Sequence, residues 1–125
     1  MAVVHTVAEL DDERTPLAFP AMRELRPQLR DVAEFVERVR RQRAAGYRLA
    51  GSFADDGSVA AVAGFWCGEN LALGRHLYVD DLVTVPAGRR QGHASALLRW
   101  LDDEAKREGC AYVLSLIHIS EPTRL

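Results

Sequence analysis

A basic, glycine-containing turn stands between a run of apolar residues and a helical pattern. It reads AGRRQGHA, residues 87–94. Where a strand turns into a helix, unpaired backbone N–H groups converge and the helix dipole adds partial positive charge, so such a turn binds anions. Gly92 would let a phosphate approach the backbone, and Arg89 and Arg90 add charge. The alternative is structural: Gly92 permits tight packing, and the arginines are solvated.

Two adjacent carboxylates interrupt the apolar, β-branched run LYVDDLVTV, residues 77–85. Such a run is typical of a central strand, where an acidic pair is costly. Adjacent strand positions point to opposite faces, so we expect one carboxylate to face a cleft, and counting back from Gly92 favours Asp80 over Asp81. A structural role remains the alternative, in which both carboxylates cap loop backbone or pair with arginines.

The surrounding pattern alternates strands and helices in one α/β domain. A helix with Pro16 or Pro20 in its first turn should end before Pro27, and Asp31 should cap a second helix that Gly46 ends. The apolar positions Ala94, Leu97, Leu98, Leu101 and Ala105 predict a third helix over 91–108. Strands are expected at 2–8, at 47–54 and 59–67 as a hairpin, and at 77–85, with an irregular segment at 68–76.

Composition narrows the class of protein. The chain has 125 residues and a net charge of −2, which gives no general attraction to nucleic acid, and we expect the basic run 38–48 to be a solvated helix face. No apolar stretch approaches the roughly 20 residues of a membrane span, and no secretion signal is evident, so the sequence predicts a cytoplasmic protein. Cys67 and Cys110 read as buried thiols, and His5 and His76 lack spaced partners for a metal.

The segment RRQGHA, Arg89 to Ala94, resembles the R/Q-x-x-G-x-G/A signature of the GNAT superfamily of acyl-CoA-dependent N-acyltransferases. The order of expected elements resembles that fold over residues 2–113, and GRHLYVDDLVT, QGHASALLRWLDDEA and GCAYV are similar to small bacterial acetyltransferases. The resemblance implies a GNAT fold, with helices on both faces of a mixed central sheet, that lacks its C-terminal helix and last strands.

The resemblance also implies a reaction and its site. Acetyl-CoA would be the co-substrate, and a small-molecule or peptidyl amine would attack it directly, with no metal, nucleic acid or membrane involved; a homodimer stays open. An amine with a pKa near 10 is only about 0.1% neutral at pH 7, a cost of roughly 4 kcal/mol that Asp80 or Asp81 could offset as general base. Tyr78 would line the acceptor pocket, and His93 is expected to face solvent in the first turn of its helix. The cofactor-binding positions would be Val83, Thr84, Val85, Arg89, Arg90, Gln91, Gly92, His93, Ala94 and Ser95.

The same turn would serve a non-catalytic acyl-CoA-binding or regulatory module equally well. An interaction protein that uses the basic face near Arg38 to Arg43 is a further alternative. Asp80 separates the first of these from an enzyme, since binding needs only the turn.

The end of the chain differs from the rest. Residues 114–124, LSLIHISEPTR, resemble a direct translation of a common sequencing-library adapter. We therefore expect residues 2–113 to form an incomplete acetyltransferase domain and residues 114–125 to be a non-native tail. The truncated chain would then be inactive or weakly active, and its helical tyrosine for protonating the leaving thiolate would be missing.

Overall fold

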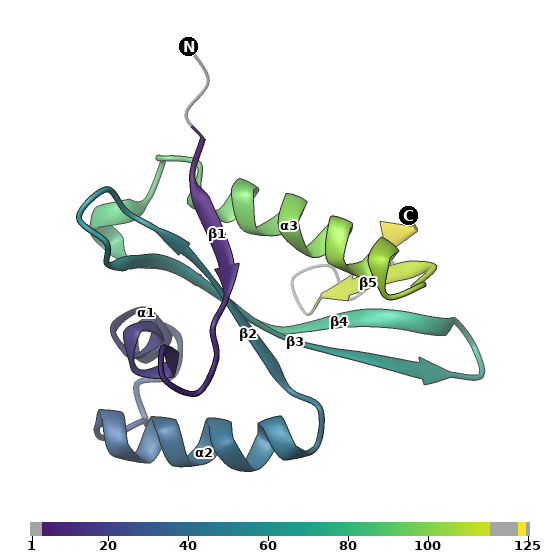
Figure 1. Ribbon diagram of the computed structural model, residues 1–125, viewed down its shortest axis with the longest axis horizontal. Coiled ribbons are helices and arrows are strands. Elements are labelled where there is room, and N and C mark those ends of the chain that lie inside the picture. Colours follow the sequence, from purple (N-terminus) through teal and green to yellow (C-terminus); the bar gives the residue numbers. More distant parts are fainter. Residues whose placement is uncertain (1–3, 116–122, 125) are drawn as a thin grey trace.

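The computed structural model describes residues 4–115 and 123–124. In these residues, six strands form one sheet in the order β1 to β6, and β4–β5 is its parallel pair while the other neighbours are antiparallel (Figure 1). The strands are β1 (Thr6–Glu9), β2 (Arg48–Phe53), β3 (Val59–Asn70), β4 (Gly74–Thr84), β5 (Tyr112–Ser115) and β6 (Thr123–Arg124).

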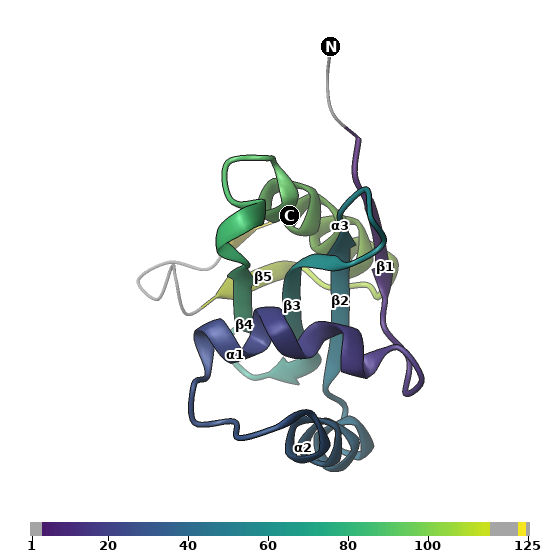
Figure 2. The same cartoon turned by 90° about the vertical axis from the view of Figure 1, so that its left-hand side faces the viewer.

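Helices cover both faces of this sheet. α1 (Phe19–Leu25) and α2 (Val32–Ala44) lie on one face, and α3 (His93–Arg107) lies on the other (Figures 1 and 2). The predicted α/β class, with a mixed sheet and helices on both faces, is confirmed. None of the helices in the described ranges has the length and apolar character needed to cross a bilayer.

Two separate apolar clusters hold these layers together. Met22, Phe35, Val39, Leu49 and Val62 pack between the sheet and α1–α2, while Phe65, Leu77, Val79, Leu97 and Leu101 pack between the sheet and α3. The predicted apolar face of α3 is confirmed for Leu97, Leu101 and Ala105, whereas Leu98 is 42% exposed. The buried face of α3 includes His93 and Glu104 instead. Glu104 forms an ion pair there with Arg48.

Local signals fix the ends of the first two helices. Both prolines take first-turn positions, Pro16 in a short 3-10 turn (Thr15–Ala18) and Pro20 in α1, and α1 ends at Leu25 before Pro27. The Asp31 carboxylate accepts from the Glu34 N–H at 2.8 Å, as predicted for the cap of α2. Gly46, with φ of +114°, follows the helix end.

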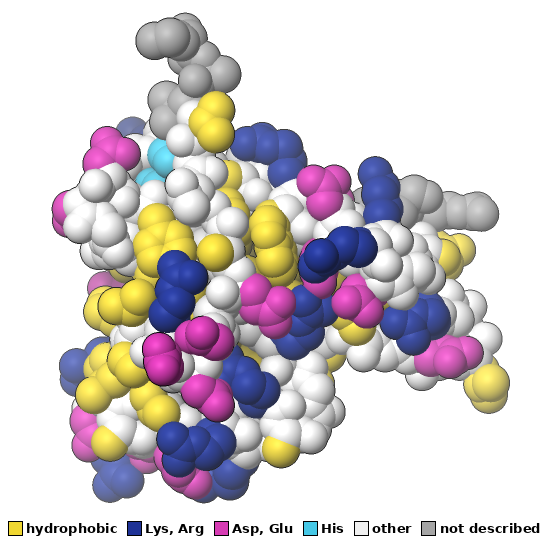
Figure 3. All heavy atoms as spheres, viewed as in Figure 1, with side chains coloured by type: hydrophobic (Ala, Val, Ile, Leu, Met, Phe, Trp, Pro, Cys, Tyr) yellow, Lys and Arg dark blue, Asp and Glu magenta, His cyan; other side chains and the backbone are white. Residues whose placement is uncertain are grey.

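The basic run 38–48 does not form one exposed positive face. Arg40 and Arg41 form ion pairs with Glu37. Arg43 forms one with Asp12, and Arg48 forms ion pairs with Glu9 and Glu104. Figure 3 shows acidic and basic side chains intermixed over this part of the surface. The expected solvated face is present on α2, because Arg38, Arg40 and Arg41 are exposed, whereas the partly buried Arg43 and Arg48 pair with residues elsewhere in the fold.

The segment expected to be irregular, residues 68–76, is instead the end of a long hairpin. β3 runs to Asn70 and β4 begins at Gly74, with Gly68 paired to His76 and Glu69 paired to Arg75. The sequence predicted an irregular segment here because it contains polar residues. These residues are tolerated in the strands because this part of the hairpin extends past β2, whose pairing with β3 ends at Phe65.

The predicted non-native tail lies largely outside the described residues. Leu114 and Ser115 continue β5 and pair with Tyr78 and Val79 of β4. Such pairing is open to any apolar segment in an extended conformation, so the origin of residues 114–125 stays a prediction.

The cap of α2 matters for the site because this helix supplies one wall of it. We predict that Asp31→Ala lowers the free energy of unfolding by about 1 kcal/mol, since the Glu34 N–H loses its acceptor. Urea denaturation measures the change. Asp31→Asn keeps a side-chain oxygen and should stay within a few tenths of the wild-type value; equal stability of Asp31→Ala and wild type would show that the cap contributes nothing.

Candidate active site

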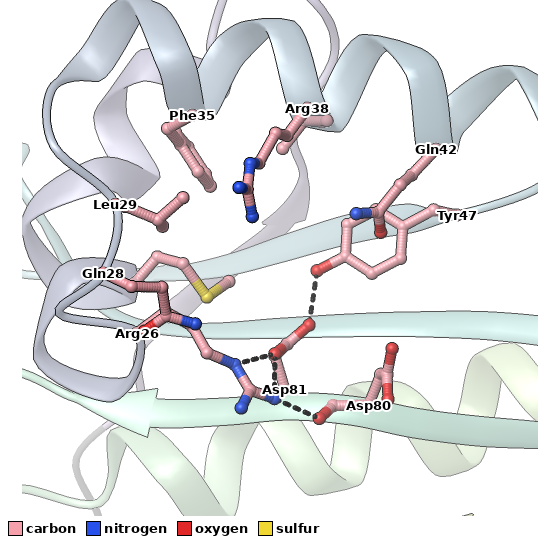
Figure 4. Close-up of a pocket in the computed structure, with 11 residues that line it drawn as sticks. Arg26, Gln28, Leu29, Phe35, Arg38, Gln42, Tyr47, Asp80 and Asp81 are labelled. Atoms are coloured by element: carbon pink, nitrogen blue, oxygen red, sulfur yellow. Dashed lines mark hydrogen bonds and ion pairs between the residues drawn. The ribbon is translucent and has the colours of Figure 1, made fainter.

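A pocket of about 210 Å³ opens between α1, α2 and the sheet (Figure 4). One side of it is apolar and is formed by Met22, Leu29, Phe35 and Val39. Polar side chains surround this apolar wall: Arg26, Gln28, Arg38, Gln42, Tyr47, Asp80 and Asp81. The pocket thus joins hydrophobic surface to a few convergent polar groups, which is the usual composition of a small-molecule site.

Both carboxylates of the acidic pair line this pocket. Asp81 pairs with Gly64 and Val79 pairs with Phe65, so Asp80 is an extra residue in β4 at a β-bulge. The bulge breaks the strict alternation of side chains, and the expectation that only one carboxylate faces the cleft is therefore wrong. Sequence reasoning could not place the bulge, because nothing in LYVDDLVTV marks an unpaired residue.

Asp81 is held from two sides. Its Oδ1 accepts from Arg26 Nε at 2.9 Å and from Arg26 Nη2 at 2.7 Å, and its Oδ2 accepts from the Tyr47 hydroxyl at 2.8 Å. The hydrogen bond to Asp81 raises the pKa of Arg26, and burial together with the Asp81 charge raises the pKa of Tyr47 well above its ordinary value. Tyr47 therefore stays protonated and acts as a donor.

Gly64 of β3 makes this contact possible. A Cβ at position 64 would lie 1.7 Å from the Tyr47 hydroxyl oxygen and 2.9 Å from Asp81 Oδ2. The missing side chain lets the Tyr47 hydroxyl cross β3 and reach the carboxylate on β4. A glycine inside an apolar strand indicates that another group approaches the backbone closely, and this indication was missed in the sequence.

Asp80 is less constrained than Asp81. Its Oδ2 accepts one long hydrogen bond from Trp66 Nε1, at 3.4 Å, and its backbone oxygen accepts from Arg26 Nη2 at 3.3 Å. Since most of its hydrogen-bonding capacity is unused by these contacts, the Asp80 carboxylate is available to a ligand in the pocket. Tyr78 lies opposite Trp66 on the same face of the sheet but is not among the pocket-lining residues.

The turn before α3 forms a second concavity, of about 230 Å³, lined mainly by the predicted segment: Thr84, Gly88, Arg89, Arg90, Gly92, His93, Ala94 and Ser95. Gly92 has φ of +86° and Arg90 has φ of +65°. The Ala96 N–H donates to the Gly92 oxygen at 3.0 Å, so the amides of residues 93–95 are the first-turn N–H groups that have no acceptor within the helix. This geometry suits an anion.

His93 does not face solvent as expected, because it is only 2% exposed. A hydrogen bond of 2.7 Å joins His93 Nδ1 to the buried Ser52 hydroxyl, and the His93 ring stacks on His5 with centroids 3.7 Å apart. Burial, with a further contribution from His5, lowers the pKa of His93. His93 therefore stabilises the turn from its buried side. His5 is hydrogen-bonded to the Gln91 carbonyl oxygen.

The edge of β4 connects the pocket and the turn. Within the described residues, β5 pairs with β4 over His76 to Val79, whereas β4 continues to Thr84. The Val85 N–H donates to Ala60 at 2.8 Å, so by strand alternation the backbone groups of Thr84 and Leu82 point to the edge away from β3. Of the three predicted positions Val83, Thr84 and Val85, only Thr84 presents its backbone to this edge.

Residues 7–124 match the family model described as Acetyltransferase (GNAT) family. No curated protein sequence matches the chain.

Several solved structures share the fold. The ribosomal-protein-alanine N-acetyltransferase from Brucella melitensis biovar Abortus 2308 superposes with a TM-score of 0.77 and 19% identity, over 90% of this chain and 79% of that one. Glucosamine-6-phosphate N-acetyltransferase from Arabidopsis thaliana gives 0.69 and 20%, over 94% and 85%. The aminoglycoside N-acetyltransferase AAC(6')-Iy in complex with CoA gives 0.76 and 14%, over 92% and 78%.

The contact across Gly64 can be tested by filling the space it leaves. We predict that Gly64→Ala lowers the free energy of unfolding by about 2–4 kcal/mol, because the methyl group displaces Tyr47 and leaves Asp81 with one partner fewer. Gly68→Ala is a matched control on the same strand, where a Cβ meets nothing within 4 Å. Chemical denaturation of both variants measures the difference, and equal stabilities would contradict this account.

Proposed function

The chain belongs to the acetyltransferase (GNAT) family, and from that membership we propose that the parent protein, with an intact C-terminal region, transfers an acetyl group from acetyl-CoA to a primary amine by direct attack in a ternary complex. The observation that carries the proposal is the bulge in β4. It directs the Asp80 carboxylate into the pocket, directly after Val79, which is the last residue of β4 that pairs with β5 within the described residues.

The residues around the turn fit a pyrophosphate. First-turn amides of α3 and the side chains of Arg89 and Arg90 border one concavity, as an anionic ligand requires. In the proposed complex, Arg89, Arg90, Gln91, Gly92, Ala94 and Ser95 would hold the pyrophosphate of acetyl-CoA. His93 would support the turn from inside, and Thr84 would pair with the pantetheine arm in place of a neighbouring strand, flanked by Val83 and Val85.

The acidic pair then has two different roles. Asp81 would position the site, since Arg26 and Tyr47 already occupy its oxygens. Asp80 would accept a proton from the bound ammonium group, directly or through a water molecule. The freed amine nitrogen attacks the thioester carbonyl carbon, a C–N bond forms and the C–S bond breaks. Of the two protons that the nitrogen loses, one passes through Asp80 to solvent and the other ends on the departing thiolate.

The acceptor is an amine, supplied as a small molecule or on a peptide. The fold neighbours include enzymes named for an aminoglycoside, a ribosomal protein alanine and glucosamine 6-phosphate. No group of three or more residues suited to hold a metal ion occurs within the described ranges. A non-catalytic acyl-CoA-binding module of the same fold is the alternative, and it makes no use of Asp80.

Cofactor binding can be tested at Gly92. A side chain at this position would be strained by φ of +86° and would contact His5 Nε2 at 3.7 Å, so the turn must change shape to accept it. We predict that Gly92→Val weakens CoA binding, measured by titration calorimetry, by about tenfold or more, which is at least ~1.4 kcal/mol. Gly109→Val is the matched control at the other end of α3, where φ is +76°, and it should leave CoA affinity unchanged. Equal loss in both variants would argue against a role for the turn.

The proposed base can be tested separately. We predict that, in the enzyme with an intact C-terminal region, Asp80→Asn lowers kcat/KM for acetyl transfer by about 10²-fold or more at pH 7, with partial recovery at higher pH as the free amine accumulates. Its thermal stability and CoA affinity should barely change, because the Asp80 carboxylate makes only one long hydrogen bond.

Asp81→Asn provides the comparison for this prediction. It should lower the melting temperature, because Arg26 loses its ion pair and Tyr47 loses a charged acceptor. If Asp81→Asn reproduces the pH-dependent loss with unchanged stability while Asp80→Asn does not, the two roles are reversed. If neither variant changes kcat/KM, the pair is structural and the binding-module alternative gains support.

A further inference from the structure

Arg38 is an arginine of α2 whose charge the fold does not use. Within the described part of the chain its guanidinium makes no ion pair or hydrogen bond, although its field contributes to lowering the pKa of Glu34. Its neighbours differ, because Arg40 and Arg41 both pair with Glu37 at the surface. Figure 4 shows the Arg38 guanidinium pointing into the pocket between Phe35 and Tyr47.

The pocket therefore contains one negative and one positive side chain that have no counter-ion. Asp81 is neutralised by Arg26 at 2.7 Å, which leaves the Asp80 carboxylate and the Arg38 guanidinium as the groups without a counter-ion in the pocket. Apolar side chains of Leu29, Phe35 and Val39 form the wall beside them. A ligand that matches this arrangement carries a cation, a short apolar body and an anion.

We propose that the acceptor is a zwitterion, a primary amine whose own carboxylate binds Arg38 while its ammonium group lies at Asp80. The proposal rests on the proposed function and narrows its substrate class. A planar guanidinium binds a carboxylate through two parallel hydrogen bonds, so Arg38 would recognise this group by geometry as well as charge. Diamines and polyamines fit poorly, since their second cation would meet Arg38 instead. The volume of about 210 Å³ suits an acceptor of amino-acid size.

A binding experiment tests the proposal without relying on turnover. The probes are ω-amino acids, from glycine to 6-aminohexanoate, compared with alkylamines and diamines of matched length, each titrated into the full chain with CoA present and followed by ligand-observed NMR. We expect one chain length to be optimal, and the best amino acid to bind at least about tenfold more tightly than its matched alkylamine. Equal affinity for amino acids, alkylamines and diamines would overturn the proposal.

Two variants separate the role of Arg38 from general charge effects. Arg38→Gln should abolish the preference for the amino acid, and Arg38→Lys should restore part of it. Arg40→Gln removes an arginine of the same helix that lies 3.5 Å from Glu37, and it should keep the full preference. A preference that survives Arg38→Gln, or that Arg40→Gln removes equally, would contradict the assignment.

Kinetics then distinguishes this proposal from the proposed function. With acetyl-CoA present, Arg38→Gln should raise KM for the amino acid about tenfold while kcat changes little, because Arg38 lies away from the reacting nitrogen. Acetylation of plain amines with no preference for a carboxylate would support the transferase and overturn the zwitterion proposal. Binding of amino acids that depends on Arg38, without acetyl transfer even in the enzyme with an intact C-terminal region, would support the ligand class and overturn the transferase.

Discussion

One extra residue in β4 determines which side of the sheet carries the chemistry. Without the bulge, residues 80 and 81 would point to opposite faces, and one carboxylate would enter the apolar cluster below α3, where burying a charge without a partner is costly. With it, both carboxylates reach the side that α1 and α2 cover, where Arg26 and Tyr47 neutralise and hydrogen-bond Asp81. The bulge, Gly64 and the two donors depend on one another. The bulge turns both carboxylates to this side, Gly64 leaves room for the Tyr47 hydroxyl, and the two donors stabilise the Asp81 carboxylate.

The same strand links this arrangement to the turn before α3. Within the described residues, β4 pairs with its parallel partner as far as Val79, continues through the acidic pair, and ends at Thr84 beside the turn. Two histidines far apart in the sequence hold this turn in place. His93 is hydrogen-bonded to Ser52 inside the domain, and His5 is hydrogen-bonded to Gln91. A short stretch of β4 thus sets the separation between the turn before α3 and the acidic pair.

Signals that act over a few residues made much of the fold predictable. Asp31 and Gly46 marked the ends of α2, and apolar spacing marked α3. The positions of Asp80, Arg38 and Tyr47 relative to one another could not be predicted, because they depend on a bulge and on contacts between residues more than 30 positions apart. His93 was misplaced for a related reason, since its burial depends on Ser52 of a distant strand.

The bulge also bears on how such a domain can change over evolutionary time. Along β4, many side chains can be exchanged for others of similar size, and the strand keeps its pairing with β3. Loss of residue 80 itself would leave Val79 opposite Phe65 and Asp81 opposite Gly64, so it would remove the bulge and its carboxylate and keep the other pairs. Loss of a paired residue between the β3–β4 turn and Val79 is different in kind, because it would shift the residues upstream of it to the opposite face. Selection on this segment therefore acts on the number of residues as strongly as on their identity, and a tolerated change of length is expected outside the interval between the β3–β4 turn and Thr84.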